Sequence, residues 1–527
     1  MGSPEVRPET TDGAAPEAPE PGRVGPHPGE QSGASPPEVD PPSTDVVDRL
    51  LHRLEGICGA EHVITHPHQL GTYQSDGLVQ YKAMPRAAVL PGTGEEVRDV
   101  IRACHEAEVP WVGGGVGSGL SGGALPIEEG ILVVLVRLRR ILEVDLDNQT
   151  VVCEPGVTNI AVSQAVGPSH FFPPDPSGQV VCTIGGMVAE NSGAAHCFKY
   201  GFTTNYVVGL EVVLPDGEVV RLGGKQAGLP GYDLVGAFVG SEGTLGVATK
   251  ITLRIVPTPE TTRTLLAFFD TTARAGGVVS EIVSRGVIPA ALEMMDRLCI
   301  RACEEMTQVG FPLDAGAALL VELEGAETDC QARFDDVQEI CERHGAFEVR
   351  VARDELEREL MWRMRRSVFP AMGRIRPHCY VQDGVIPRTK LSEVLTRIEE
   401  LSSEHGLDVA NVVHAGDGNL HPLVCYDGHS EGEAERAERL AGMIVLACAE
   451  AGGSITGEHG IGVDKQRSMP GMFSEDDLAA FEKLRYAFDP YGRANPGNVM
   501  PTPRLCGEVP GPYRRHPLEV AGLSERL

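Results

Sequence analysis

The sequence predicts a mixed α+β protein with at least two domains, and three observations support this class. The chain has 527 residues, which is too many for one hydrophobic core. From residue 86 onward, short apolar segments typical of buried strands alternate with apolar residues at helical spacing. After residue 260, a second series of strand-like segments is again separated by helical patterns.

The composition argues against several classes of protein. The 45 basic and 75 acidic residues give a formal charge of −30, so general binding to nucleic acid or to an anionic membrane is not expected. The 13 cysteines contain no C-x-x-C pair, which indicates neither a disulfide framework nor an iron–sulfur cluster. No apolar run approaches the length of a membrane span, and the N-terminus lacks the apolar core of a signal peptide. We therefore expect a cytoplasmic protein with reduced thiols.

Residues 1–42 are rich in Pro, Gly, Glu and Ser and carry almost no large apolar side chains. Such a segment buries too little surface to offset the entropy of ordering, so we expect a disordered tail. The ordered part should begin near Ser43 with a helix. Its apolar residues follow helical spacing at Val46, Val47, Leu50, Leu51 and Leu54.

A glycine-rich loop follows the second strand of the N-terminal half. The first strand is expected at residues 87–90, and Thr93 with Glu96 forms the capping box of the helix that follows it. The second strand, at residues 110–112, runs directly into residues 113–123, where most positions are glycine. Glycine lets backbone N–H groups approach a ligand closely and point at anionic oxygens. We expect a pyrophosphate here; the alternative is a flexible glycine turn.

The same loop contains a match to the dinucleotide motif G-x-G-x-x-G, formed by Gly117, Gly119 and Gly122. That motif requires a helix directly after it, because the helix N-terminus faces the phosphate. Here the chain instead continues through Pro126 into a strand at residues 131–136. We therefore reject an NAD-type Rossmann site.

The C-terminal half reads as a second domain. Pro257 and Pro259 mark its beginning. Helical patterns separate its expected strands, such as the one that ends at Gly345. The expected strands lie at residues 264–269, 291–294, 318–323 and 347–351.

A candidate metal site lies in the C-terminal half. His414 and His421 flank a turn at residues 416–419, built from Gly, Asp, Gly and Asn. On one helix, residues seven apart lie about 10 Å apart along the axis, whereas two imidazoles on one metal must each approach it to about 2 Å. A tight turn that folds the chain back meets this requirement. Glu458 and His459 add a carboxylate and a third imidazole, as in a catalytic metal site. The alternative is a polar hairpin and an unrelated glycine loop.

Several ordered motifs carry a resemblance to a known family. The glycine loop and the N-terminal segments at 174–177, 185–193 and 242–246 resemble the FAD-binding half of the vanillyl-alcohol-oxidase-type flavoproteins. The C-terminal motifs resemble the group that contains the flavoprotein D subunit of bacterial glycolate oxidase and the D-lactate and D-2-hydroxyglutarate dehydrogenases. These motifs lie at residues 362–365, 384–387, 414–421, 457–462 and 495–498. The resemblance runs from about residue 45 to residue 510.

The resemblance implies an α+β fold with a two-lobed FAD-binding domain, at residues 43–260 here. A substrate- and metal-binding domain with a large antiparallel sheet would follow at residues 261–485. The remaining segment, residues 486–527, would return to the FAD domain. These bounds combine the family's domain order with the composition shifts of this sequence.

The resemblance also implies the residues that hold FAD. The family commonly has Arg where this chain has Gly114, and a second Gly where it has Ala194, which puts individual contacts in doubt but leaves the phosphate cradle intact. The sequence contains no obvious covalent flavin anchor, so we expect dissociable FAD. The implied residues are Gly115, Val116, Gly117, Ser118, Gly119, Gly123, Ala124, Ser177, Gly185, Gly186, Asn191, Ser192, Glu242, Val247 and Asn498.

His414, His421 and Glu458 match the metal ligands of the family. Two imidazoles and a carboxylate suit Zn²⁺, and Mn²⁺, Fe²⁺ and Co²⁺ remain compatible. His459 is the candidate general base, since an imidazole pKa near 6.5 suits proton abstraction. Alternation along an extended segment would point Glu458 and His459 to different sides and give them separate roles. Alternatively, both bind metal.

Arg365 matches the family position that binds the substrate carboxylate, which a guanidinium can hold through two hydrogen bonds. Arg374 is a second candidate. Read without the family, the arginines of residues 363–366 are a solvated helix face.

We therefore predict FAD-dependent oxidation of a small D-2-hydroxy acid, glycolate or D-lactate, by hydride transfer to the flavin with help from a metal. D-2-hydroxyglutarate is an alternative that needs another cation for its distal carboxylate. A non-catalytic FAD-binding subunit should lack the His and Glu set at 414–421 and 458–459, and a metal-stabilised binding protein without redox activity would be colourless.

Iron–sulfur and second flavin subunits, or another electron acceptor, are candidate partners. A homodimer and peripheral attachment to the membrane through partners are left open.

Overall fold

The computed structural model describes residues 44–226 and 230–501. The predicted disordered tail at residues 1–42 lies outside the described residues, as do residues 502–527 of the C-terminal segment.

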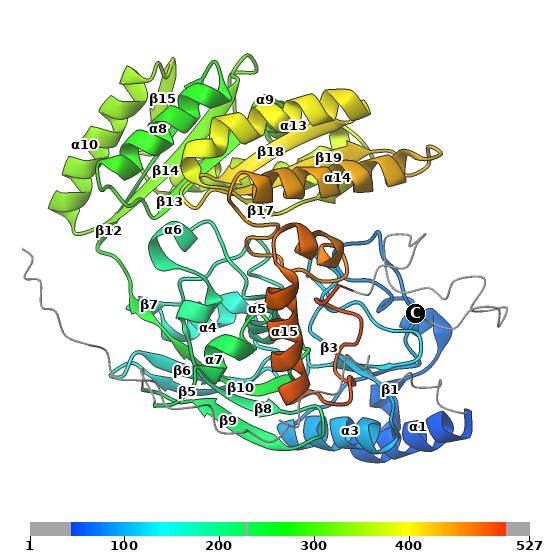
Figure 1. Cartoon of the computed structure of the whole chain (residues 1–527). Helices are drawn as coiled ribbons and strands as arrows, with labels where there is room; N and C mark the ends of the chain where they lie inside the picture. The colour runs from blue at the N-terminus through cyan, green and yellow to red at the C-terminus, as the bar shows by residue number, and fades with distance from the viewer. Residues whose placement is uncertain (1–43, 227–229, 502–527) are drawn as a thin grey trace, which may run out of the picture. The chain divides into compact units, whose positions relative to one another are not determined.

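The first sheet joins the segments on both sides of the glycine-rich loop (Figure 1). Its elements are α1 (Thr44–Cys58), β1 (Val63–Ile64), α2 (Pro67–Leu70), β2 (Ala87–Val89), α3 (Gly94–Glu106), β3 (Trp111–Gly114) and β4 (Ile131–Val134). The strand order is β1-β2-β4-β3, and β2, β4 and β3 are parallel. Helices α1 and α3 pack against it through buried apolar residues such as Leu54 and Ile101. Thr93 caps α3 by accepting a hydrogen bond from the N–H of Glu96, as the capping motif predicts.

Residues 115–130, between β3 and β4, contain no helix. The predicted absence of a helix directly after the glycines is therefore confirmed, and an NAD-type site requires that helix.

The second sheet is antiparallel and has the order β5-β6-β10-β8-β9. Its strands are β5 (Ile141–Asp145), β6 (Thr150–Cys153), β8 (Val207–Val213), β9 (Val219–Gly223) and β10 (Val247–Arg254). The helices around it are α4 (Asn159–Val166), α5 (Ile184–Glu190), α6 (Cys197–Tyr200) and α7 (Leu234–Phe238), and β7 (His170–Phe171) pairs with β11 (Val256–Pro257). Thr183 begins α5 by accepting a hydrogen bond from the N–H of Gly186. This cap explains why the glycine pair at 185–186 opens a helix rather than a loop.

The third sheet is the large antiparallel sheet that the sequence predicts, with the order β15-β12-β14-β13-β18-β19-β16 and β17 paired to β19. Its strands are β12 (Thr261–Phe269), β13 (Ala291–Asp296), β14 (Ala317–Gly325), β15 (Glu348–Val351), β16 (His378–Val381), β17 (Gly384–Val385), β18 (Asp408–His414) and β19 (Asn419–Tyr426). The four strands expected between residues 264 and 351 are all present.

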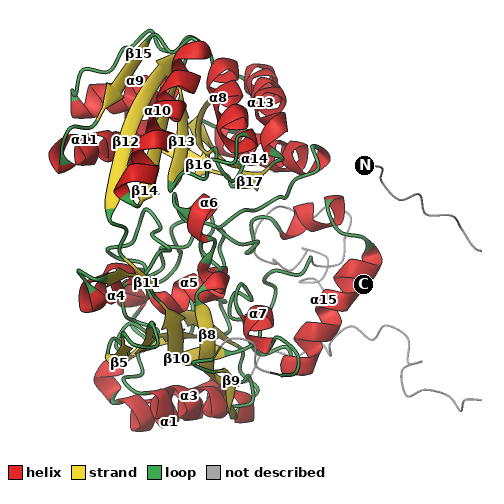
Figure 2. Ribbon diagram, turned by 90° about the vertical axis from the view of Figure 1, so that its left-hand side faces the viewer, coloured by secondary structure: helices red, strands yellow, loops and turns green. Residues whose placement is uncertain are grey.

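Alternate side chains of this sheet pack against two layers of helices. Leu265 and Ala267 of β12 face one layer, and Leu266 and Phe268 face the other. The first layer is α8 (Thr272–Ser284), α10 (Glu327–Arg343), α13 (Leu391–His405) and α14 (Glu433–Glu450). The second is α9 (Arg297–Thr307), α11 (Glu355–Arg366) and α12 (Val368–Ala371). Figure 2 shows strands β12 and β14 between these layers.

The chain returns to the first sheet after α15 (Glu475–Phe488), which runs beside the N-terminal half in Figure 1. Trp111 N–H donates to the carbonyl of Arg493, and Asn495 N–H donates to the carbonyl of Trp111. The side-chain amides of Asn495 and Asn498 both donate to the carbonyl of Gly123 in the glycine-rich loop. All described elements fall in one compact unit, so the domain bounds at residues 260 and 485 stay predictions.

Candidate active site

Most of the residues predicted for FAD line two adjoining cavities, of about 450 and 80 Å³. The larger one is lined by Gly115, Val116, Gly117, Ser118, Gly119, Ala124, Ser177, Gly186 and Ser192, and the smaller one also by Gly123, Gly185, Glu242 and Val247. The departures Gly114 and Ala194 line the smaller and the larger cavity respectively. Asn191 and Asn498 line neither. Asn191 instead accepts a hydrogen bond from Thr204 N–H, and Asn498 holds the carbonyl of Gly123.

The glycine-rich loop fits an anionic ligand. The N–H groups of residues 116–119 donate no hydrogen bond to any described residue, and these residues line the larger cavity. A Cβ atom at Gly115 would lie 2.6 Å from Thr183 Oγ1, and Gly117 has a φ of +70°. Glycine is therefore required for this path of the backbone, and unpaired donors facing a cavity are what a pyrophosphate needs.

Glu242 also connects two parts of the chain. Its buried carboxylate accepts hydrogen bonds from the N–H groups of Ile461 and Gly462, at 2.7 and 2.8 Å, and from Asn498. Although it lines the smaller cavity, its oxygens are engaged within the protein. Glu242 thus ties the segment after His459 to the smaller cavity.

The hairpin of β18 and β19 brings His414 and His421 together. His421 pairs with Val412, two residues before His414, so both imidazoles point to the same face of the sheet. The turn is closed by the N–H groups of Asp417 and Gly418, which both donate to the His414 carbonyl. The ring centroids lie 5.0 Å apart. The tight turn predicted between the two histidines is confirmed.

Glu458 completes a cluster with these histidines. Its Oε1 lies 3.3 Å from His414 Nε2 and 2.9 Å from His421 Nε2. One ligand atom from each residue lies within 4.8 Å of the others, close enough to share one cation. Burial opposes a charge on His414, but the carboxylates of Glu293 and Glu458 raise its pKa to about 10. The fully buried Glu293 and the half-buried Glu458 place two carboxylates at this cluster, which makes it attractive to a cation.

Glu293, which the sequence did not reveal, orients both His414 and Arg365. It lies on β13, is fully buried, and its two carboxylate oxygens lie 2.8 and 2.9 Å from His414 Nδ1. Nδ1–H is therefore the donor to Glu293, and a metal bound at Nε2 would replace the proton that the raised pKa keeps there. The only available signal was an acidic residue inside an apolar strand.

Arg365, at the end of α11, lines the larger cavity and is only 8 % exposed. Its Nε donates to Glu293 Oε2 at 2.6 Å, and its Nη2 lies 3.4 Å from His414 Nδ1. Arg374, the second candidate, is exposed and does not line the cavity. Of the two arginines, only Arg365 is near the His414 cluster.

His459 lies beside the cluster. Its ring stacks on that of His421, with 5.0 Å between centroids, and its Nε2 lies 4.0 Å from Glu458 Oε1. Burial lowers the pKa of His459 to about 4, so the imidazole is neutral and able to accept a proton.

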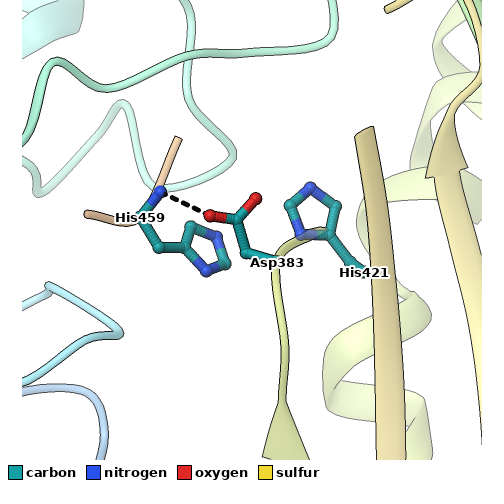
Figure 3. Close-up of side chains that lie close together, drawn as sticks. All are labelled: Asp383, His421 and His459. Carbon is teal, nitrogen blue, oxygen red and sulfur yellow. Dashed lines mark hydrogen bonds between the residues drawn. The ribbon is translucent and has the colours of Figure 1, made fainter. Parts of the chain in front are cut away.

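The expected alternation of Glu458 and His459 along an extended segment is wrong. Residues 457–459 form a bend, and their N–H groups all donate to Asp383. The close-up in Figure 3 shows Asp383 beside the rings of His421 and His459, with the hydrogen bond from His459 N–H drawn as a dashed line. The bend, rather than strand alternation, separates the two side chains.

Comparison with known proteins identifies the family. Residues 85–223 match the FAD binding domain model, and residues 258–499 match the model for the C-terminal domain of FAD linked oxidases. The chain is 45% identical to glycolate oxidase subunit GlcD of Escherichia coli strain K12 over 476 residues, which cover 90% of this chain and 95% of that one. It is 36% identical to D-lactate dehydrogenase of Archaeoglobus fulgidus, over 79% of this chain and 93% of that one.

Among solved structures, p-cresol methylhydroxylase with substrate bound superposes with a TM-score of 0.71. The match covers 87% of this chain and 98% of that one, at 15% identity, and therefore supports the fold alone. None of the described helices combines the length and the apolarity that crossing a bilayer requires. From the two family models and the GlcD match, we conclude that this chain is a member of the FAD-linked oxidases.

Proposed function

We propose that this FAD-linked oxidase converts a small D-2-hydroxy acid, glycolate or D-lactate, to the 2-oxo acid. The observation that carries the proposal is one cavity lined by the glycine-rich loop, Arg365, the His414–His421–Glu458 cluster and a neutral His459. The names of the E. coli and Archaeoglobus relatives support this substrate class.

Residues 115–119 and the start of α5 would hold FAD, whose flavin, when bound, supplies the hydride acceptor. His414, His421 and Glu458 would hold a divalent cation, and their donor set favours Zn²⁺ over Mn²⁺ or Fe²⁺. That cation would polarise the substrate hydroxyl.

The side chains of the cavity divide the remaining work. Arg365 would bind the substrate carboxylate through the N–H groups that Glu293 leaves free. His459 Nε2 would accept the hydroxyl proton as the C2 hydride leaves, so that the C–O bond becomes C=O and two electrons go to the flavin. Glu293 keeps Arg365 and His414 in one fixed arrangement.

The cavity favours a monocarboxylic acid over D-2-hydroxyglutarate. Besides Arg365, the only Lys or Arg in its lining is Arg366, which is paired with Glu359. Within the described residues, the lining therefore offers no unpaired cation to a distal carboxylate. The wall near Arg365 is apolar and is formed by Val368, Phe369, Val381, Val412 and Leu423.

Electron transfer onward requires an acceptor. The E. coli relative is named as a subunit, which supports partner chains. Such partners, with an iron–sulfur centre or a second flavin, would accept the electrons. A cytoplasmic location, with any membrane contact made through such partners, belongs to the same proposal.

Anaerobic stopped-flow mixing of the FAD-loaded protein with glycolate, D-lactate, L-lactate and D-2-hydroxyglutarate tests the proposal. We expect flavin bleaching with glycolate or D-lactate and a far slower response to L-lactate and D-2-hydroxyglutarate. A yellow protein that none of the four acids bleaches would instead support a non-catalytic FAD subunit, and a colourless one a binding protein.

A further inference from the structure

A fully buried carboxylate, Asp383, lies between β16 and β17, beside the His414–His421–Glu458 cluster. Three consecutive N–H groups, those of Gly457, Glu458 and His459, donate to its Oδ2 at 2.8, 3.1 and 3.0 Å. Successive N–H groups that converge on one anion form a nest. Thr456 Oγ1 donates to the same oxygen at 2.6 Å. The bend that carries Glu458 and His459 is thus wrapped around this carboxylate.

Asp383 also holds the hairpin of the two histidines. Its Oδ1 accepts a hydrogen bond of 2.7 Å from the side-chain amide of Asn419, and Asn419 pairs with His414 across the hairpin. The two segments meet closely, since a Cβ atom at Gly457 would lie 1.6 Å from Asn419 Nδ2. One carboxylate therefore connects the two parts of the chain that supply the cluster.

The geometry alone would also allow Asp383 to bind a metal, because ligand atoms of Asp383, His421 and His459 lie within 4.8 Å of one another. Its hydrogen bonds argue against this role. Asn419, Thr456, Lys465 and the three N–H groups of residues 457–459 make six donors. Five of them donate to Oδ2, while Oδ1 accepts from Asn419 and, at 3.3 Å, from Glu458 N–H, so both oxygens are already engaged within the protein. Glu458, by contrast, directs its Oε1 at His414 and His421.

The charge of Asp383 is balanced inside the protein. Lys465 is 2 % exposed, and its ammonium lies 3.3 Å from Asp383 Oδ2 and donates to the carbonyl of Gly460. Burial favours the neutral acid, but the Lys465 ammonium holds the pKa of Asp383 well below its usual range. Asp383 is thus an anion with an internal counter-ion rather than a ligand waiting for a cation.

We propose that Asp383 is a positioning residue that fixes the bend at residues 456–459 against the histidine hairpin, so that Glu458 reaches the metal and His459 reaches the substrate. This rests on the proposed function for the roles of Glu458 and His459. The arrangement itself rests only on the hydrogen bonds around Asp383.

The test compares the FAD-loaded wild type with Asp383→Asn/Lys465→Met. Removing both charges avoids an unpaired buried lysine, which by itself would destabilise the fold. Asp296→Asn is the control, because Asp296 is a half-buried carboxylate at the end of β13 that accepts hydrogen bonds from Cys299 and Asn411 N–H groups. Three quantities are measured: amide hydrogen exchange of a peptide covering residues 455–463, Zn²⁺ affinity by competition with a chelating dye, and substrate-driven flavin reduction at saturating Zn²⁺.

For the double variant we expect faster exchange at residues 457–459, Zn²⁺ binding weakened about 10- to 100-fold, and slower flavin reduction even at saturating Zn²⁺, with FAD retained. The control should match the wild type in all three. Unchanged exchange and unchanged Zn²⁺ affinity in a folded double variant would overturn the proposal, and so would equal losses in the control. If the wild type binds no Zn²⁺ and is bleached by no hydroxy acid, the proposed function fails, while the exchange measurement still decides the role of Asp383.

Discussion

Replacing Glu293 by glutamine should weaken metal and substrate binding together. Glu293 accepts hydrogen bonds from His414 Nδ1–H and from Arg365 Nε–H, and it is fully buried. The glutamine side chain has the same shape as glutamate but carries no charge. Its amide N–H group would also face one of the two donors, His414 Nδ1–H or Arg365 Nε–H, where an acceptor is needed. His414 then loses the partner that fixes its tautomer, and Arg365 loses its buried counter-ion.

The size of the effect follows from these two contacts. A hydrogen bond to a charged group contributes about 1.5–3 kcal/mol. Removal of a carboxylate behind a metal-bound histidine typically weakens metal binding about 10- to 100-fold. We therefore expect Glu293→Gln to weaken Zn²⁺ binding by that factor and to raise the substrate concentration needed for half-maximal flavin reduction. FAD binding should be unchanged, because Glu293 lines neither cavity.

Glu322→Gln is the matched control for this variant. Glu322 lies opposite Ala291 on the neighbouring strand β14, is 1 % exposed, and binds Arg358 and Trp362 instead of the His414 cluster. Metal affinity is measured by competition with a chelating dye, FAD content by absorbance, and substrate affinity by stopped-flow reduction. Wild-type Zn²⁺ affinity in Glu293→Gln, or an equal loss in Glu322→Gln, would refute the reasoning.

Three further predictions follow from the site. His459→Ala should slow flavin reduction by about 10²- to 10⁴-fold while FAD stays bound; reduction at the wild-type rate would exclude His459 as the base. Removing metal with a chelator should lower the rate of flavin reduction, and added Zn²⁺ or Mn²⁺ should restore it; full activity in a demonstrably metal-free sample would contradict the metal's role. Burial raises the pKa of Asp76 from 3.8 to about 7, so between about pH 4 and pH 7 the folded state holds a proton that the unfolded chain has lost. The folded state therefore loses stability as the pH rises through this window. In the FAD-free protein, the melting temperature should fall less steeply with pH for Asp76→Asn than for the wild type. Parallel plots of melting temperature against pH for the two proteins would contradict this.

Local patterns in the sequence predicted much of the fold. The apolar run at residues 264–269 is strand β12 as predicted, and it is buried on both faces because its side chains point alternately to two helix layers. The capping motif at Thr93 and the absent helix after Gly122 also depend on neighbouring residues only. Where a prediction relied on an assumed local conformation, as for Glu458 and His459, it was wrong because a distant carboxylate sets the bend.

The sequence by itself determined which chemical groups are available: a glycine-rich loop without a following helix, two imidazoles across a tight turn, and a Glu-His pair. Each is encoded within about ten residues, where spacing and turn residues dictate geometry. Only the tertiary structure decided how these groups are held. Glu293 is 121 residues from His414, and Asp383 is 76 residues from His459. Both are buried carboxylates whose ionised state is stable only because folding surrounds them with donors and cations, and no short-range pattern records that.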